Sequence, residues 1–193
     1  MQNKFQNKYR IPSARLQSWD YGSNGAYFIT ICTQNKEYYF GEIINHEMHL
    51  NEIGKLAEQY WIEIPNHFSF IELGNFVVMP NHVHGILIIN KMNTVQTLHC
   101  NVETLHPNVQ TLHCNVSTDK NNQMALISPK SGSIPTIIRS YKSIVTKMSR
   151  NIHADFGWQP RFHDHIIRNA TSFENIQNYI FENPEKWDED KFK

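Results

Sequence analysis

Two histidines, His82 and His84, are one residue apart within the apolar segment 76–89, whose sequence is FVVMPNHVHGILII. If this segment is a β-strand, both imidazoles project from one face, while Val83 points to the other. Imidazole is a common metal ligand, and two imidazoles among aliphatic side chains are costly to bury without a compensating partner. The spacing therefore predicts a metal site. The alternative is a pair of histidines that are simply hydrogen-bonded or solvated.

A second pair of residues that could take part in chemistry, Tyr179 and Asn183, lies near the end of the chain. Residues 171–182 (TSFENIQNYIFE) have the periodicity of a helix, so residues four apart lie on one face. If that face meets the histidine strand, two imidazoles and a carboxamide oxygen surround a metal with a phenol beside it. The metal would act as a Lewis acid on a phosphoryl oxygen, and tyrosine can form a covalent intermediate. Taken singly, Tyr179 is more simply a packed aromatic, and Asn183 a helix end before Pro184.

Tyr141 is the rival nucleophile, flanked by Arg139 and Lys142 in the segment 135–150 (PTIIRSYKSIVTKMSR). We disfavour Tyr141 because it falls on the apolar side of its predicted helix and has no ligand residue four positions on. The polar side of the same helix is the most basic stretch of the chain. It predicts contacts to a phosphate backbone through Arg139, Lys142 and Lys147, although a solvated helix face is the alternative.

The segment before the nucleophile helix, residues 158–168 (WQPRFHDHIIR), supplies further candidates for DNA binding. Arg168 can hold a phosphate with its planar guanidinium, and His165 can carry a proton or contact DNA. Arg161 is a third candidate in this segment. Ordinary packing and solvation of a strand face is the competing explanation for all three.

The elements that must position these residues follow from periodicity and from turn residues. The His strand is expected to pair in a hairpin that turns at Pro80-Asn81, and Ser172 is a plausible N-cap of the nucleophile helix. The remaining polar and apolar patterns predict strands at 27–33, 38–44, 70–79, 82–89 and 158–168, and helices at 51–64 (ending before Pro65), 135–150 and 171–182.

A heptapeptide repeat (TVQTLHC, NVETLHP, NVQTLHC) occupies most of residues 93–116. Its units are rich in Thr and Asn and contain a Pro, which does not suit a coiled coil. We interpret residues 93–133 as a low-complexity linker. Because the unit was copied, its potential zinc ligands are not independent of one another, and we do not interpret them as a metal site: His99, Cys100, His106, His113 and Cys114.

The composition indicates one domain over residues 1–193, opened by a polar arm at 1–25. Lysines and arginines number 18 and so do the acidic residues, so the net charge is zero and any polyanion site must be a local patch. Three cysteines, no signal-like segment and no apolar run long enough for a bilayer predict a reduced, cytoplasmic protein with no membrane partner.

Three blocks in this order resemble the single-tyrosine HUH transposases, in particular the branch of REP-associated and IS200-like transposases. They are residues 27–43 (YFITICTQNKEYYFGEI), 76–89, and 158–187 (WQPRFHDHIIRNATSFENIQNYIFENPEKW). The middle block carries the family's His-hydrophobic-His motif as His82, Val83 and His84. In the last block, the family's nucleophile matches Tyr179, and the polar helix residue that completes the metal site matches Asn183.

The resemblance implies an α+β fold, a ferredoxin-like HUH domain whose central antiparallel sheet is backed by helices. It also implies that Tyr179 attacks a scissile phosphate in single-stranded DNA bearing a palindromic hairpin. The 5′ side becomes linked as a phosphotyrosine, a 3′-hydroxyl is released, and a second strand end reverses the step. The cofactor would be Mg²⁺ or Mn²⁺, with Mn²⁺ better suited to two imidazoles. The sequence leaves open whether the protein is a monomer or a homodimer.

Two other functions remain open at this point. A domesticated protein of the same fold would bind hairpin DNA without cleaving it. A metal-dependent phosphohydrolase would use water as the nucleophile, so Tyr179 would be dispensable.

Overall fold

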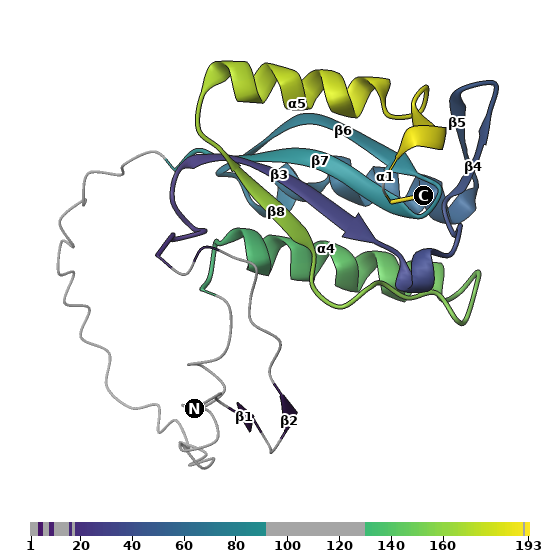
Figure 1. Ribbon diagram of the computed structural model, residues 1–193. Helices are drawn as coiled ribbons and strands as arrows, with labels where there is room; N and C mark the ends of the chain where they lie inside the picture. The colour runs from purple at the N-terminus through teal and green to yellow at the C-terminus, as the bar shows by residue number, and fades with distance from the viewer. Residues whose placement is uncertain (1–3, 6–7, 10–15, 17, 92–129, 191) are drawn as a thin grey trace, which may run out of the picture.

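The computed structural model describes residues 4–5, 8–9, 16, 18–91, 130–190 and 192–193. Its centre is a four-stranded antiparallel sheet in the order β6-β7-β3-β8 (Figure 1). The strands are β3 (Gly25–Cys32), β6 (Ile71–Met79), β7 (His82–Ile89) and β8 (His163–Ile167). The strand with the two histidines, β7, is therefore an inner strand, paired on both sides.

Helices cover both faces of this sheet. On one face lie α1 (Glu52–Ile62) and α4 (Ile134–Ser149), and on the other lies α5 (Ala170–Glu182) (Figure 1). The order β3-α1-β6-β7-α4-β8 is the βαββαβ arrangement of ferredoxin-like domains. The predicted fold class, an α+β protein with a central antiparallel sheet backed by helices, is confirmed.

Alternation along β7 assigns its side chains to two separate layers. Val83 and Leu87 point into the main core, where they meet apolar residues of α1 and α4 such as Trp61 and Ile138. Ile86 points the other way, into a smaller cluster with Ile180 of α5. Because residues two apart share a face, His82 and His84 lie on the side that α5 covers. The sheet therefore brings the histidines to the helix that carries Tyr179.

Smaller elements surround this framework. The strands β4 (Gly41–Ile44) and β5 (Glu47–Leu50) form a hairpin, as do β1 (Lys4–Phe5) and β2 (Lys8–Tyr9). Short helical turns are η1 (Gln34–Lys36), α2 (Ile64–His67) and η2 (Trp187–Glu189). The last of these starts the C-terminal segment, which crosses back toward the turn of the β6-β7 hairpin at Pro80-Asn81 (Figure 1).

Most predicted elements are confirmed, with shifted boundaries. The hairpin at 70–89 turns at Pro80-Asn81 as expected, and the helix predicted at 135–150 is α4. The segment predicted as extended over 158–168 is a strand only from His163, preceded by an isolated bridge at Trp158. The helix predicted at 51–64 is α1, which ends at Ile62.

One local prediction was wrong, and two short elements were not predicted. Residue Ser172 is not the N-cap of α5, because Asn169 is, and its Oδ1 accepts a hydrogen bond from the backbone N of Ser172 at 2.8 Å. The short helix α2 was not predicted, and it includes Pro65 in its first turn, where proline loses no helical hydrogen bond. The strand β5 was missed because the turn before it, at Asn45 and His46, has positive φ at both residues, and histidine is not a typical turn signal.

The heptapeptide repeat and its cysteines and histidines lie outside the described residues, so the linker at 93–133 and the division into arm and domain stay predictions. Within the described part of the chain, no helix combines the length and the apolar character that crossing a bilayer requires.

Candidate active site between the sheet and the last helix

Hydrogen bonds hold the Nδ1 side of both histidine rings. His82 Nδ1 donates to Asn81 Oδ1 at 2.7 Å, and His84 Nδ1 is 2.8 Å from Thr30 Oγ1 on the neighbouring strand β3. Both histidines are fully buried, and their ring centroids are 4.4 Å apart. With Nδ1 occupied, each ring presents Nε2 to the space below α5, which is the arrangement that metal-binding histidines generally have.

The helix α5 brings Tyr179 and Asn183 to this space from above. The hydroxyl of Tyr179 is 3.3 Å from His84 Nε2, and its ring meets the edge of Phe28. Tyr179 is 38% exposed, so an incoming strand can reach this residue, whereas Asn183 is buried. The four residues singled out by spacing, His82, His84, Tyr179 and Asn183, thus meet at one place.

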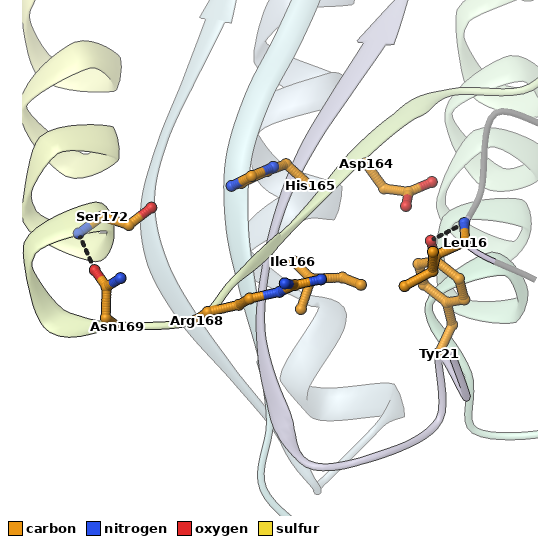
Figure 2. A pocket seen from close by; sticks show the side chains of 8 residues that line it. All are labelled: Leu16, Tyr21, Asp164, His165, Ile166, Arg168, Asn169 and Ser172. Carbon is orange, nitrogen blue, oxygen red and sulfur yellow. Dashed lines mark hydrogen bonds between the residues drawn. The ribbon is translucent and has the colours of Figure 1, made fainter. Parts of the chain in front are cut away.

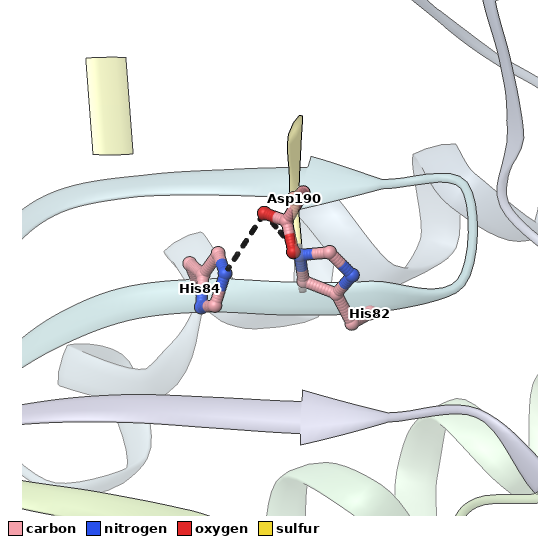
Figure 3. Close-up of side chains that lie close together, drawn as sticks. All are labelled: His82, His84 and Asp190. Atoms are coloured by element: carbon pink, nitrogen blue, oxygen red, sulfur yellow. Dashed lines mark ion pairs between the residues drawn. The ribbon is translucent and has the colours of Figure 1, made fainter. Parts of the chain in front are cut away.

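A carboxylate from the C-terminal segment completes the cluster. Asp190 Oδ2 accepts hydrogen bonds from Asn183 Nδ2 at 2.7 Å and from the Tyr179 hydroxyl at 3.3 Å. The same oxygen lies 4.0 Å from Nε2 of both His82 and His84, and the Asp190 side chain is 1% exposed. Figure 3 shows the carboxylate facing both rings.

The C-terminal segment is itself held against the histidines by aromatic contacts and backbone hydrogen bonds. The ring of Phe192 lies 5.3 Å from that of His82 and 5.4 Å from that of His84. Asn81 Nδ2 donates to the carbonyl of Phe192 at 2.9 Å, so one side chain fixes both the His82 ring and this segment. The ring of Trp187 also packs against His82, with 5.9 Å between the ring centroids.

Burial and charge set the protonation states at the site. Burial lowers the pKa of His82 to about 4, so its ring is neutral at pH 7 and has a lone pair at Nε2. Burial, together with the adjacent Asp190 carboxylate, raises the pKa of Tyr179 to about 12. The phenol is therefore a weak nucleophile until a positive charge comes near it.

Two buried polar atoms of the cluster have no hydrogen-bond partner among the described residues, namely His82 Nε2 and Asn183 Oδ1. An unpaired buried polar atom costs free energy, which a metal ion at this place would compensate. One ligand atom each of His82, His84 and Asp190 lies within 4.8 Å of the others. Two imidazole nitrogens, a carboxylate and a carboxamide oxygen are ligands that suit Mn²⁺, so the donor set fits a divalent cation.

The rival nucleophile, Tyr141, is excluded by its surroundings. It is 2% exposed on the core side of α4, and its hydroxyl donates to the carbonyl of Ala57 at 3.0 Å. Burial raises its pKa. No DNA strand can reach this hydroxyl without opening the core.

The predicted DNA contacts fall into two separate groups. Arg139, Lys142 and Lys147 line a hollow of about 610 Å³ between α4 and residues 157–160. Because α4 covers the sheet face opposite α5, this hollow is not beside Tyr179 (Figure 1). Lys142 is partly buried, its Nζ donates to the carbonyls of Gln159 and Arg161, and burial lowers its pKa to about 8.

The second group lies along the edge strand β8. His165 and Arg168 line a hollow of about 520 Å³ that reaches from the first turn of α5 to Tyr21 (Figure 2). In the register, His165 pairs with Phe28, which in turn touches the rings of His84 and Tyr179, so His165 lies on the sheet face of the candidate site. Arg161 precedes β8 in a left-handed turn and is exposed.

Sequence reasoning missed Asp190, Thr30 and Asn81. Asp190 ends the acidic run Asp188-Glu189-Asp190, which resembles an ordinary solvated surface and has no fixed spacing to the histidines. Thr30 is brought to His84 only by strand register. Asn81 was interpreted as a turn residue, and its place directly before His82 was the one available signal for a further role.

Comparisons with known proteins agree with the fold. No protein-family model matches the chain. An uncharacterised protein of Haemophilus influenzae is 36% identical over 184 residues, which span 93% of this chain and 91% of that protein. The structure of a REP-associated tyrosine transposase bound to a REP hairpin is similar with a TM-score of 0.54 and 16% identity, covering 92% of this chain and 74% of that one. The chain therefore belongs to the same family as the Haemophilus influenzae protein, and it has the fold of the REP-associated tyrosine transposase.

Proposed function

We propose that this protein is a metal-dependent transposase that nicks and rejoins single-stranded, hairpin-forming DNA, with Tyr179 as the nucleophile. The observation that carries the proposal is the 3.3 Å approach of the Tyr179 hydroxyl to a buried pair of histidines whose Nε2 atoms share one small space. The likeness of fold to a REP-associated tyrosine transposase supports the same activity.

In the proposed reaction, the oxygen of Tyr179 attacks the scissile phosphorus and the bond from phosphorus to the 3′ oxygen breaks. The 5′ side stays on Tyr179 as a phosphotyrosine, and the 3′ oxygen leaves and takes up a proton. The phenolic proton goes to the nearest anionic acceptor, Asp190 Oδ2, which the hydroxyl already faces at 3.3 Å. Attack by a second 3′-hydroxyl on the phosphotyrosine reverses these steps and rejoins DNA.

A divalent cation bound here would polarise the scissile phosphate and favour the phenolate. We propose that His82 and His84 hold it through Nε2, with Asn183 Oδ1 and the Asp190 carboxylate as oxygen ligands. This set extends the one inferred from the sequence, His82, His84 and Asn183, by one carboxylate. Both Mg²⁺ and Mn²⁺ are candidates, and the two nitrogen ligands favour Mn²⁺.

DNA is proposed to approach along β8, on the sheet face that carries the site. The side chains of His165 and Arg168, and Arg161 at the turn before the strand, would contact the phosphate backbone there. The basic hollow on α4, with Arg139, Lys142 and Lys147, is a second candidate contact. Since α4 lies on the opposite sheet face, it would hold a part of the hairpin distant from the cleaved bond.

The test is incubation of the full chain with hairpin-bearing single-stranded DNA, 5′- or 3′-labelled, in the presence of Mn²⁺, followed by a denaturing gel. We expect a covalent protein–DNA adduct that retains the 5′ side, that EDTA prevents, and that Tyr179→Phe abolishes. The matched control is Tyr38→Phe, which removes the hydroxyl of another exposed tyrosine and should leave the adduct unchanged.

Each other outcome points to a different function. Binding without an adduct, in wild type as in Tyr179→Phe, would indicate a domesticated hairpin-binding protein. Cleavage that survives Tyr179→Phe would indicate a phosphohydrolase with water as the nucleophile. Sedimentation of the same samples distinguishes a monomer from a homodimer.

A further inference from the structure

A small hollow lies beside Tyr179 and adjoins the histidine cluster, with which it shares Asn183 and Asp190. It has a volume of about 310 Å³, at the lower end of the range for small-molecule sites. The rest of its wall is a stripe of α5 residues three or four apart together with residues that follow the helix: Asn175, Asn178, Tyr179, Glu182, Lys186 and Glu189. Tyr179 thus lines the hollow and, through its hydroxyl, contacts the histidine cluster.

The side chains around this hollow leave hydrogen-bonding capacity unused. Asn175 and Asn178 are exposed, and neither carboxamide has a hydrogen bond to another described residue. Glu182 forms an ion pair with Lys186 at 2.6 Å, and this pair already engages the positive charge of Lys186. Glu189 is also exposed here. The hollow therefore offers two amides and an excess of carboxylates.

We infer that this hollow reads the base of a nucleotide that flanks the scissile phosphate, through Asn178 and Asn175. The inference rests on the proposed function and adds a sequence preference to it. A strand held with its phosphate at the Tyr179 hydroxyl must direct its neighbouring bases to either side of that residue. One side is this hollow, so a flanking base enters it.

Charge decides which part of the nucleotide fits. The carboxylates repel a phosphate, so the backbone stays on the side of the histidines and the uncharged base occupies the hollow. A carboxamide pairs with an amino group next to a ring nitrogen, which adenine and cytosine offer, and carboxylates accept from the same amino groups. Thymine has no amino group and would instead turn a carbonyl oxygen toward Glu182 and Glu189. Guanine also offers N–H donors to these carboxylates, so the preferred base is one that carries an amino group, and thymine is disfavoured.

The experiment first maps the bond that wild-type protein cleaves, and then compares substrates that differ only in the two nucleotides flanking it. We expect adduct formation to favour adenine or cytosine over thymine at one of the two positions by roughly five- to 150-fold, the range for one bidentate base contact. In Asn178→Ala this ratio should fall severalfold, while the rate on the thymine substrate stays the same. Asn175→Ala should have a smaller effect of the same kind.

The control is Glu174→Ala, an exposed residue of α5 that does not line the hollow and should keep the wild-type ratio. A general defect of helix α5 lowers all rates together and leaves the ratio unchanged. An adduct with no preference, a preference for thymine, or a ratio unaltered by Asn178→Ala would overturn base reading while leaving the nicking activity standing. Absence of any adduct from wild type would instead overturn the proposed function, and base reading with it.

Discussion

At the scale of single residues, the partners at Nδ1 decide what the two histidines can do. A histidine whose Nδ1 is hydrogen-bonded has its tautomer and ring orientation fixed, so Nε2 becomes the available ligand atom. Asn81 provides this hydrogen-bond partner for His82, and Thr30 provides it for His84. The spacing of the histidines showed that they share a face, but not which ring nitrogen faces the site, because that depends on a residue of a neighbouring strand.

Replacement of Thr30 by Val tests this support. The Val side chain has nearly the same shape but no hydroxyl, so His84 loses its partner at Nδ1 without leaving a large cavity. We expect the affinity for Mn²⁺, measured by calorimetry, to fall by about 10- to 100-fold. Thr146→Val on α4, which removes a hydroxyl bonded to the carbonyl of Lys142, should leave Mn²⁺ affinity as in wild type. Equal affinity in both variants would contradict a role for Thr30.

Asp190 provides a test of the electrostatics of Tyr179. Its carboxylate is one of the causes that raise the pKa of the phenol to about 12, so at pH 10 only about 1% of Tyr179 is ionised in the metal-free protein. Asp190→Asn keeps the shape and removes the negative charge, which lowers the pKa of Tyr179 toward its ordinary value. The phenolate absorbance at pH 10 should therefore be larger for Asp190→Asn than for wild type. In each case the absorbance of the same protein with Tyr179→Phe is subtracted, so that only Tyr179 contributes. An unchanged difference would show that burial alone sets this pKa.

At the scale of elements, periodicity found the strand and helix that carry the site, and tertiary contacts supplied the remainder. Alternation in β7 and the four-residue spacing in α5 predicted two faces, and the sheet brings these faces together. The C-terminal segment with Asp190 has no such pattern. Its position depends on contacts with Asn81, Trp187 and the histidine rings, which no local signal encodes.

The packing between β7 and α1 depends on Gly85, which lies next to His84. A Cβ at this position would come within 2.3 Å of Cζ2 of the fully buried Trp61. In Gly85→Ala we therefore expect the free energy of unfolding to fall by about 1 to 3 kcal/mol or more, measured by chemical denaturation. Ser140→Ala, at an exposed position of α4, should cause no loss. A Gly85→Ala protein as stable as wild type would show that Trp61 can move aside.

At the scale of the whole molecule, the framework is a ferredoxin-like unit, with α5 and the C-terminal segment on the sheet face that carries the histidines. The predicted blocks correspond to this framework because each contains a complete strand or helix with a clear apolar face. For the repeat between β7 and α4, the sequence predicted no element with an apolar face. The two ends of this connection are nevertheless tied together, because Lys91 Nζ donates to the carbonyls of Gly22 and Gly132.

This tie predicts that the fold tolerates a much shorter connection. Replacing residues 93–129 by a Gly/Ser linker about a quarter as long should raise the free energy of unfolding by about 1 kcal/mol, since each halving of a loop is worth about 0.6 kcal/mol. The measurement is chemical denaturation, in which we expect a single cooperative transition. A loss of stability of 2 kcal/mol or more, or an unfolded product, would show that the repeat contributes to the fold.

The position of the last residues has a practical consequence for anyone preparing this protein. The carbonyls of Phe192 and Lys193 accept hydrogen bonds from Asn81 and Lys36, and the Phe192 ring contacts both histidines. A purification tag fused after Lys193 would begin directly beside the candidate metal ligands, and a polyhistidine tag would add competing imidazoles there. Metal titrations and cleavage assays should therefore use protein tagged at the other end of the chain, or with the tag removed.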